Sequence, residues 1–189
     1  ALDIIQKAGL PSVITIAPMA ENVMRDGVSI MDVCKELEQR GADVVGMNCF
    51  RGPATMLPYL KEIRRAISCH MAALPLPYRT TKENPTFFNL PDNNGCTCNA
   101  PHGRTFPTAL DPLYCNRYEM RAFFEEVNKI GIKLLGVCCG ATPMHQREVA
   151  EAVGRTVPAS KYREKMANHF MYGTNERIAK HMQEYGDKA

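Results

Sequence analysis

Apolar positions along the chain follow two different periods. Continuous runs of apolar and β-branched residues, typical of strands buried on both faces, lie at 12–19, 43–48, 69–76 and 132–137. Segments with apolar residues three and four positions apart follow these runs and predict amphipathic helices at 30–40, 53–67, 117–130 and 143–153. A short helix is also expected at 2–7, and a long loop at 77–116.

The order strand, short loop, helix occurs four times and predicts a parallel sheet covered by helices, which is an α/β fold. A complete (β/α)8 TIM barrel usually needs about 250 residues. We therefore expect residues 1–157 to supply about the last four βα units of such a barrel, with 158–189 as a polar tail. The alternative is a small open α/β sheet that is complete as written. The first βα turn carries neither a G-x-G-x-x-G nor a Walker A motif, which disfavours a nucleotide-binding sheet.

Composition narrows the class of protein. With 45% hydrophobic and 23% charged residues, the chain resembles an average globular domain. No apolar run approaches the roughly 20 residues of a membrane span. The net charge of +3 comes from basic residues scattered among acidic ones, so we expect no nucleic-acid partner. No targeting signal is recognisable, so the cytoplasm is the default location. A reducing compartment suits the eight cysteines better than a disulfide framework does.

Three cysteines stand at the carboxyl ends of predicted strands. Cys49 ends the second strand, and Cys138 and Cys139 end the fourth. In a parallel βα architecture this edge carries the functional site. Gly136 and Gly140 flank the cysteine pair and would let the backbone turn both sulfurs inward. The pattern predicts three thiolates that hold one ion.

Three thiolates with an open fourth position are typical of a catalytic zinc site, although sulfur ligands also accept copper(I) or an iron–sulfur cluster. Such a site suits the binding of a substrate thiol. A free thiol has a pKa near ~8.5, and only the thiolate is a good nucleophile. The chemistry indicated is alkyl transfer to sulfur.

Other sulfur and imidazole side chains are expected to have structural roles. Cys96-x-Cys98 with His102 could form a second metal cluster, but the spacing favours an exposed loop. The remaining candidates are assigned to packing or to ordinary surface positions: Cys34, Cys69 and Cys115 (packing), His70 (hydrogen-bonded interior), His145 (helix surface), and Met19, Met47 and Met71 (core).

Two motifs, GMNC at 46–49 and GVCCG at 136–140, resemble the zinc-ligand motifs of the homocysteine S-methyltransferase family. The segments ALPLPYRT at 73–80, FFNLPD at 87–92 and ALDPLYCNRYEM at 109–120 resemble the betaine-dependent members of that family. The resemblance extends from about residue 1 to residue 158.

This resemblance implies a (β/α)8 barrel in which Cys49, Cys138 and Cys139 bind Zn²⁺ and the sulfur of homocysteine completes the tetrahedron. Asn48 is expected to brace the site. The implied reaction is methyl transfer from betaine to homocysteine, which gives methionine and dimethylglycine. S-methylmethionine or another methyl donor is the alternative.

The family's residues for betaine and for the amino acid group of homocysteine lie largely in earlier βα units, which this sequence lacks. Its substrate-binding residues therefore remain unassigned. We expect a homo-oligomer, formed through a tail that faintly resembles the family's dimerisation arm, or a complementing N-terminal half. The non-enzymatic alternative is a half-barrel fragment that keeps the zinc ligands without turnover.

Overall fold

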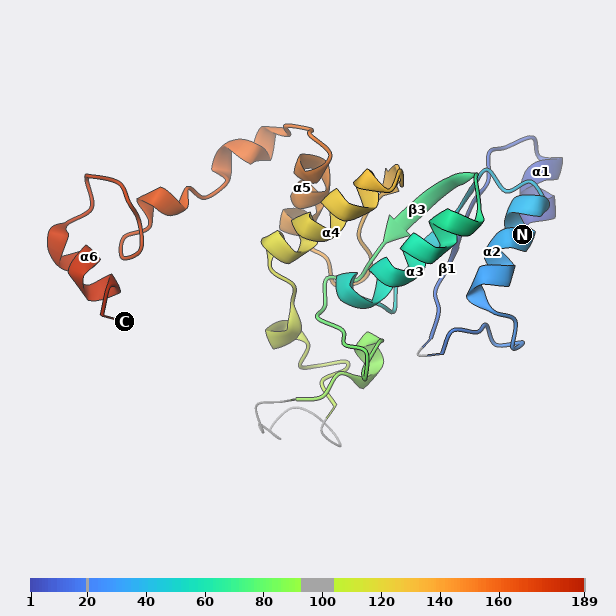
Figure 1. Cartoon of the computed structure of the whole chain (residues 1–189), viewed down its shortest axis with the longest axis horizontal. Coiled ribbons are helices and arrows are strands. Elements are labelled where there is room, and N and C mark those ends of the chain that lie inside the picture. Colours follow the sequence, from blue (N-terminus) through green and yellow to red (C-terminus); the bar gives the residue numbers. More distant parts are fainter. Residues whose placement is uncertain (20, 93–103, 189) are drawn as a thin grey trace. The chain divides into compact units, whose positions relative to one another are not determined.

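The computed structural model describes residues 1–19, 21–92 and 104–188, and the chain divides into two compact units, 1–155 and 156–189. Unit 1 holds an α/β core (Figure 1). Cys96, Cys98 and His102, the candidates for a second metal cluster, lie outside the described residues.

The described part of unit 1 contains a four-stranded sheet in the order β1-β2-β3-β4. Its strands are β1 (Val13–Ile16), β2 (Val44–Asn48), β3 (His70–Leu74) and β4 (Leu134–Leu135). Every neighbouring pair is parallel. The expected α/β fold with a parallel sheet is therefore confirmed.

The helices lie close to their predicted positions. They are α1 (Leu2–Lys7), α2 (Ile30–Gln39), α3 (Pro53–Ala66), α4 (Arg117–Lys129) and α5 (Pro143–Ala152). Local capping explains this agreement: the side chain of Ser29 accepts the Asp32 N–H, and that of Asn116 accepts the Glu119 N–H. These contacts satisfy amide groups that the first turn of a helix leaves without a partner.

All four strands are shorter than predicted, β1 and β4 most of all. β1 ends at Ile16, two residues before Pro18, which has no N–H to donate to a sheet. β4 has only two residues, yet the backbone continues beside β3. The Gly136 N–H donates to the Ala73 carbonyl at 3.2 Å, and the Cys138 N–H donates to the Pro75 carbonyl at 3.0 Å. The irregular end of β4 therefore stays attached to the sheet.

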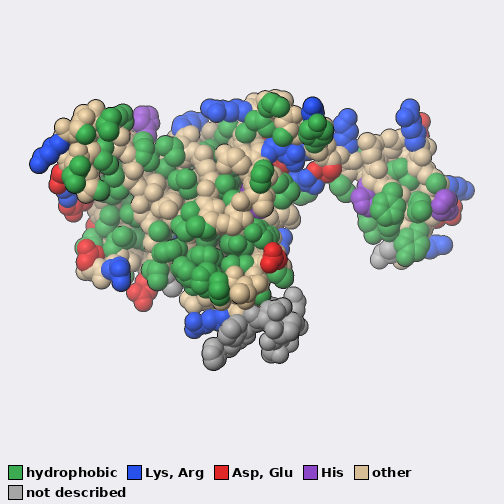
Figure 2. Space-filling model, turned by 180° about the vertical axis from the view of Figure 1, so that it is seen from behind, with side chains coloured by type: hydrophobic (Ala, Val, Ile, Leu, Met, Phe, Trp, Pro, Cys, Tyr) green, Lys and Arg blue, Asp and Glu red, His purple; other side chains and the backbone are tan. Residues whose placement is uncertain are grey.

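The main core lies on one face of the sheet. Alternate strand residues such as Ile16, Met47 and Met71 join buried side chains from helices α1 to α5 in a single cluster. The other face carries the intervening residues, for example Thr15 and Gly46. Helix α3 lies in front of the strands in Figure 1, and the view from behind shows hydrophobic side chains on the opposite side of unit 1 (Figure 2).

Burial corrects several sequence-based assignments. Met47, Met71 and Cys34 are buried core residues, as expected. Met19 is not: it follows the end of β1 and is 53% exposed. His70 was expected inside, but it begins β3 and is exposed. Cys69 precedes that strand and is half-buried, and it packs against the main core, which agrees with its expected packing role. All three lie at or beyond a strand terminus, where the apolar run extends further than the sheet.

Unit 2 is built from short elements: 3-10 turns at Pro158–Tyr162 and Met166–Asn168, and helix α6 (Lys180–Gly186). Several of its aromatic side chains, including Tyr162, Phe170 and Tyr185, are exposed. None of the helices in the described residues of the chain combines the length and apolar character that a membrane span requires.

Candidate metal centre

The three candidate cysteines meet at the carboxyl-terminal edge of the sheet. Cys49 directly follows β2, and Cys138 and Cys139 follow β4. The end of β3 lies between these two segments and forms backbone hydrogen bonds with each. Its Leu74 carbonyl accepts the Cys49 N–H at 3.0 Å, and the Pro75 carbonyl accepts the Cys138 N–H at 3.0 Å. Backbone hydrogen bonds thus fix the relative positions of the two cysteine-bearing segments.

The sulfur atoms have the spacing of ligands to one ion. The Sγ atom of Cys139 lies 3.7 Å from that of Cys49 and 3.8 Å from that of Cys138, and all three lie within 4.8 Å of one another. A tetrahedral zinc ion with Zn–S bonds near 2.3 Å places its sulfur ligands about 3.8 Å apart. Cys139 is exposed and the other two are half-buried, so the cluster opens toward solvent. The donor set fits zinc with one position left for a further ligand.

The backbone at Cys49 adopts an uncommon conformation. Cys49 and Phe50 have φ angles of +60° and +59°, in the left-handed region that non-glycine residues seldom occupy. The surrounding backbone holds this turn, because the Phe50 carbonyl accepts the Phe87 N–H and the Arg51 carbonyl accepts the Leu76 N–H, both at 3.0 Å. Such conformations concentrate at functional sites, where the rest of the fold enforces them.

Gly140 gives the segment after the cysteine pair a conformation that a side chain would prevent. Its φ angle is +84°, and a Cβ atom there would lie 2.2 Å from the hydroxyl oxygen of Tyr78. Gly136 has a milder constraint, since its Cβ would lie 3.2 Å from Leu74 Cδ2. The turn that presents the two sulfurs therefore depends mainly on Gly140.

Burial, assisted by a hydrogen bond to the Cys138 side chain, raises the pKa of the Cys49 thiol to about 12. Burial disfavours the charged thiolate of Cys49, and the neighbouring thiols add to this effect. A divalent cation at the cluster reverses this preference and deprotonates the coordinating thiols. The Cys49 thiol therefore needs a nearby cation to become ionised.

Asn48, the expected bracing residue, is the last residue of β2 and is half-buried beside Cys49. In the sheet register it lies opposite Leu74. This places it at the functional edge, and its bracing role stays a prediction.

His145 was expected on the helix surface, and this is wrong, because its side chain is 1% exposed. The Thr142 N–H donates to its Nδ1 at 3.0 Å, so Nε2 carries the proton and donates to the Cys115 carbonyl at 3.2 Å. The sequence signal was a Thr142-Pro143 helix start with His145 as the third helical residue, the position that reaches back to the cap. Cys115 is 4% exposed, which agrees with its expected packing role.

Tyr114 lies next to the candidate centre, although nothing in the sequence pattern singled it out. Its hydroxyl donates to the Gly140 carbonyl at 2.8 Å. Its ring stacks on His145 with centroids 5.8 Å apart and contacts the Tyr78 ring at 4.9 Å. The long loop between β3 and α4 thus reaches the segment that carries two of the cysteines.

A half-buried aromatic group borders the same region. Phe88 contacts Phe50 at a centroid distance of 5.0 Å and Phe106 at 4.9 Å, both edge to face. Cys49 and Cys138 pack against the hydrophobic cluster to which these rings belong. The candidate centre therefore has an aromatic wall on one side.

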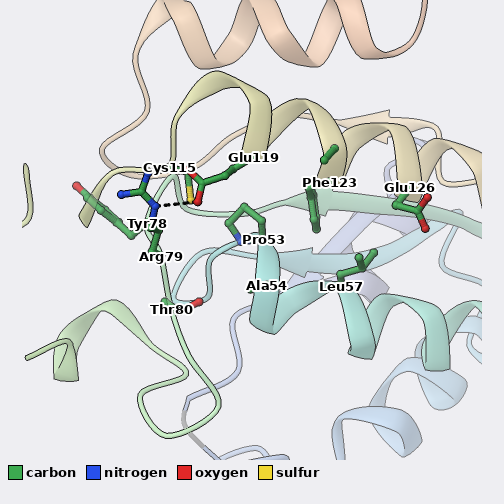
Figure 3. Close-up of a pocket in the computed structure, with 11 residues that line it drawn as sticks. Pro53, Ala54, Leu57, Tyr78, Arg79, Thr80, Cys115, Glu119, Phe123 and Glu126 are labelled. Atoms are coloured by element: carbon green, nitrogen blue, oxygen red, sulfur yellow. Dashed lines mark hydrogen bonds and ion pairs between the residues drawn. The ribbon is translucent and has the colours of Figure 1, made fainter. Parts of the chain in front are cut away.

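A separate cavity of about 420 Å³ lies between α3 and α4 (Figure 3). Pro53, Leu57 and Phe123 line it, and the Arg79–Glu119 ion pair closes one end. None of the three candidate cysteines lines this cavity. It is distinct from the metal centre.

The parallel sheet carries its helices on one face and three convergent thiols at its carboxyl edge. This combination defines an α/β protein equipped to bind a thiophilic metal. The sequence profile described as "Homocysteine S-methyltransferase" matches residues 1–153. The chain belongs to the homocysteine S-methyltransferase family.

Individual relatives differ in methyl donor. The betaine–homocysteine S-methyltransferase 1 of Danio rerio is 32% identical over 155 residues, covering 80% of this chain and 36% of that protein. The S-methylmethionine–homocysteine S-methyltransferase BHMT2 of Mus musculus is 27% identical over 171 residues, covering 85% of this chain and 43% of that protein. The chain thus spans about two fifths of the length of these relatives.

Among solved structures, the oxidized form of the homocysteine methyltransferase MmuM from Escherichia coli is similar, with a TM-score of 0.49 and 12% sequence identity. The match covers 78% of this chain and 38% of that one.

Proposed function

We propose that this chain provides the zinc-binding half of a (β/α)8-barrel enzyme that transfers a methyl group to the sulfur of homocysteine. The observation that carries the proposal is the spacing of 3.7 and 3.8 Å between Sγ atoms that arrive from two different strand ends. Family membership supplies the reaction class.

In this proposal Cys49, Cys138 and Cys139 bind zinc and leave one position open on the exposed side of the cluster. Zinc supplies Lewis acidity that keeps a fourth thiol ionised near neutral pH. A general base is then unnecessary. The task left to the protein is to orient the nucleophilic sulfur and to exclude water from the methyl donor.

Betaine is the proposed donor, with methionine and dimethylglycine as products, and S-methylmethionine is the alternative. Both donors carry their methyl groups on a positively charged atom. The half-buried rings of Phe50, Phe88 and Phe106 are suited to such a cation, because aromatic faces attract positive charge. The relatives include enzymes named for each donor, so a direct comparison of the two is required.

We further propose that the amino acid group of homocysteine and the betaine carboxylate bind residues beyond these 189, supplied by a complementing N-terminal half. Unit 2 is the proposed oligomerisation arm. The cytoplasm remains the proposed location. The competing function is that of a non-catalytic fragment that binds zinc without turnover.

Zinc content of the purified, reduced chain tests the metal centre. We expect about one zinc per chain, lost in Cys138→Ser. Cys69→Ser is the matched control, because Cys69 is a half-buried cysteine outside the cluster, and it should keep the metal. A folded wild-type chain without zinc, or equal zinc in Cys138→Ser, would contradict the proposal.

Methyl transfer tests the reaction. The chain, with and without an N-terminal half from a relative, is incubated with homocysteine and either betaine or S-methylmethionine, and methionine is measured. We expect methionine from betaine only when both halves are present, and none with Cys138→Ser. A zinc-loaded chain that forms no methionine from either donor, with either partner arrangement, supports the non-catalytic alternative.

A further inference from the structure

Two side chains hold the segment that follows the cysteine pair. The Tyr114 hydroxyl donates to the Gly140 carbonyl at 2.8 Å, directly after Cys139. Two residues further on, the Thr142 N–H donates to His145 Nδ1 at 3.0 Å. Because the Tyr114 and His145 rings stack on each other, the two anchors form one unit. This unit fixes both ends of the three-residue segment 140–142.

Tyr114 is itself held firmly by backbone contacts. It forms an antiparallel bridge with Tyr78. On either side of this bridge, the Arg79 N–H donates to the Leu113 carbonyl and the Cys115 N–H donates to the Pro77 carbonyl, both at 2.8 Å. The Tyr114 hydroxyl therefore reaches Gly140 from a backbone that has little freedom to move.

An ion pair beside the bridge between Tyr78 and Tyr114 strengthens this support of Gly140. The Arg79 guanidinium donates from two nitrogens to the two carboxylate oxygens of Glu119, at 2.7 and 2.8 Å (Figure 3). Glu119 also belongs to the capping box of Asn116 that starts α4. The ion pair, the bridge and the Tyr114 hydroxyl thus connect the start of α4 to the loop that carries Cys138 and Cys139.

The geometry points to Tyr114 as a positioning residue for the metal centre, an inference that rests on the proposed function. The Tyr114 hydroxyl fixes the Gly140 carbonyl, and with it the backbone of Cys139, so that the sulfurs keep their spacing before an ion arrives. Without this hydrogen bond, segment 138–142 samples more conformations, and metal binding must then pay for ordering it. The hydroxyl does not touch substrate.

The test uses cobalt(II), whose absorption reports both thiolate ligation and tetrahedral geometry. Reduced wild-type chain and Tyr114→Phe are titrated with cobalt(II) in competition with a chelator, and cobalt retained by Cys138→Ser is subtracted. Tyr114→Phe keeps the ring stack and removes only the hydroxyl. We expect a loss of about three- to tenfold in cobalt affinity, as for one hydrogen bond, with altered ligand-field bands.

Tyr59→Phe is the control, because it removes a tyrosine hydroxyl that donates to Asn22 from helix α3, away from the cysteine pair. Its cobalt affinity and spectrum should match wild type. The urea midpoint of the metal-free chain should fall no further in Tyr114→Phe than in Tyr59→Phe, which separates positioning from a general loss of stability.

The outcomes distinguish the two proposals. Wild-type affinity and spectra in Tyr114→Phe would overturn this inference and leave the metal centre intact. An equal loss in Tyr59→Phe would also overturn it. A wild-type chain that binds no cobalt at the cysteines would overturn the proposed function, and this inference with it.

Discussion

Backbone conformation at single residues determines how the candidate centre is presented. Cys49 occupies the left-handed region although it has a side chain, whereas Gly140 occupies it in a position that no side chain could share. Backbone contacts with neighbouring residues hold Cys49 in this conformation. At position 140, glycine is required because Tyr78 leaves no room for a Cβ atom. The two sides of the site therefore respond differently to substitution.

Gly140→Ala is expected to damage the metal centre. The new Cβ would overlap the Tyr78 hydroxyl, 2.2 Å away, and a φ of +84° disfavours any side chain. We expect a loss of stability of about 1–3 kcal/mol and a zinc affinity more than about tenfold weaker. Urea unfolding and zinc competition with a chelator measure the two effects.

Gly131→Ala is the matched control. Gly131 has a similar φ of +87°, but its Cβ would meet nothing within 4 Å. It should lose about 1 kcal/mol of stability from the backbone conformation alone and keep wild-type zinc affinity. If both variants bind zinc equally well, the contact between Gly140 and Tyr78 does not shape the site.

The convergence of the cysteines could be predicted from the sequence, because the ends of parallel strands meet at one edge whatever the loops do. The roles of Tyr114 and His145 could not. Tyr114 lies 26 positions before its partner Gly140, and their contact depends on the path of an irregular loop. His145 occupies a polar helix start, and its burial depends on the same loop covering it.

At the scale of elements, the contact between α4 and α5 includes charges that are withdrawn from solvent. Arg121 of α4 donates from Nε to Glu148 at 2.9 Å and from Nη2 to Glu151 at 2.7 Å. The Glu148 side chain is fully buried. Breaking a buried pair is costly because the remaining charge loses its compensation.

Arg121→Met is therefore expected to reduce the free energy of unfolding by on the order of 3 kcal/mol. Arg40→Met is the comparison, because Arg40 pairs with Asp3 at 2.8 Å on the surface, with both side chains about half exposed or more. It should cost much less, because solvent screens an exposed pair. Urea unfolding at neutral pH measures both, and equal losses would show that burial of Glu148 is unimportant.

The ion pair between Arg79 and Glu119 predicts that the free energy of unfolding depends on pH. Hydrogen bonds from the Arg79 side chain, aided by the Asn116 N–H, hold the pKa of Glu119 below its usual value of 4.5. The folded state then favours the ionised form. Its contribution to stability is present above about pH 4.5 and is lost as the pH falls through the lowered folded-state pKa.

Glu119→Gln should consequently be less stable than wild type at neutral pH, with the difference shrinking as the pH falls below about 4.5. Urea midpoints at several pH values measure this. Arg79→Met removes the larger cause of the lowered pKa and should lose most of the pH-dependent part, because the Asn116 N–H still donates to Glu119. A wild-type advantage over Glu119→Gln that stays constant down to acidic pH would contradict this role of the ion pair.

Helices α1 to α5 were predictable to within one residue, since their ends are set by local signals such as Ser29 and Asn116, whereas α6 in the expected polar tail was not predicted. Strand lengths were not, because an apolar run continues past the point where a neighbouring strand offers hydrogen bonds. β4 shows this most clearly: its predicted run covers 132–137, yet it pairs with β3 as a strand only through Leu134 and Leu135.

For the molecule as a whole, the arrangement of helices supports the proposed barrel. Helices α1 to α5 contribute to one core on one face of a sheet whose strands follow in sequential order. A doubly wound sheet would carry helices on both faces, whereas a barrel keeps them outside. The sequence predicted the alternation of strands and helices, and closure into a full barrel stays a prediction, because it requires strands beyond those described here.

The division into two units leads to the last prediction, which concerns removal of unit 2. All three candidate cysteines and Tyr114 lie in unit 1, so a chain ending at Arg155 should keep zinc affinity within about twofold of the intact chain. If unit 2 is the proposed oligomerisation arm, sedimentation should show a smaller assembly after truncation. Cys138→Ser should show the reverse pattern, with zinc lost and assembly unchanged. Loss of zinc from a truncated chain that remains folded would mean that residues 156–189 belong to the metal centre and not to a separate unit.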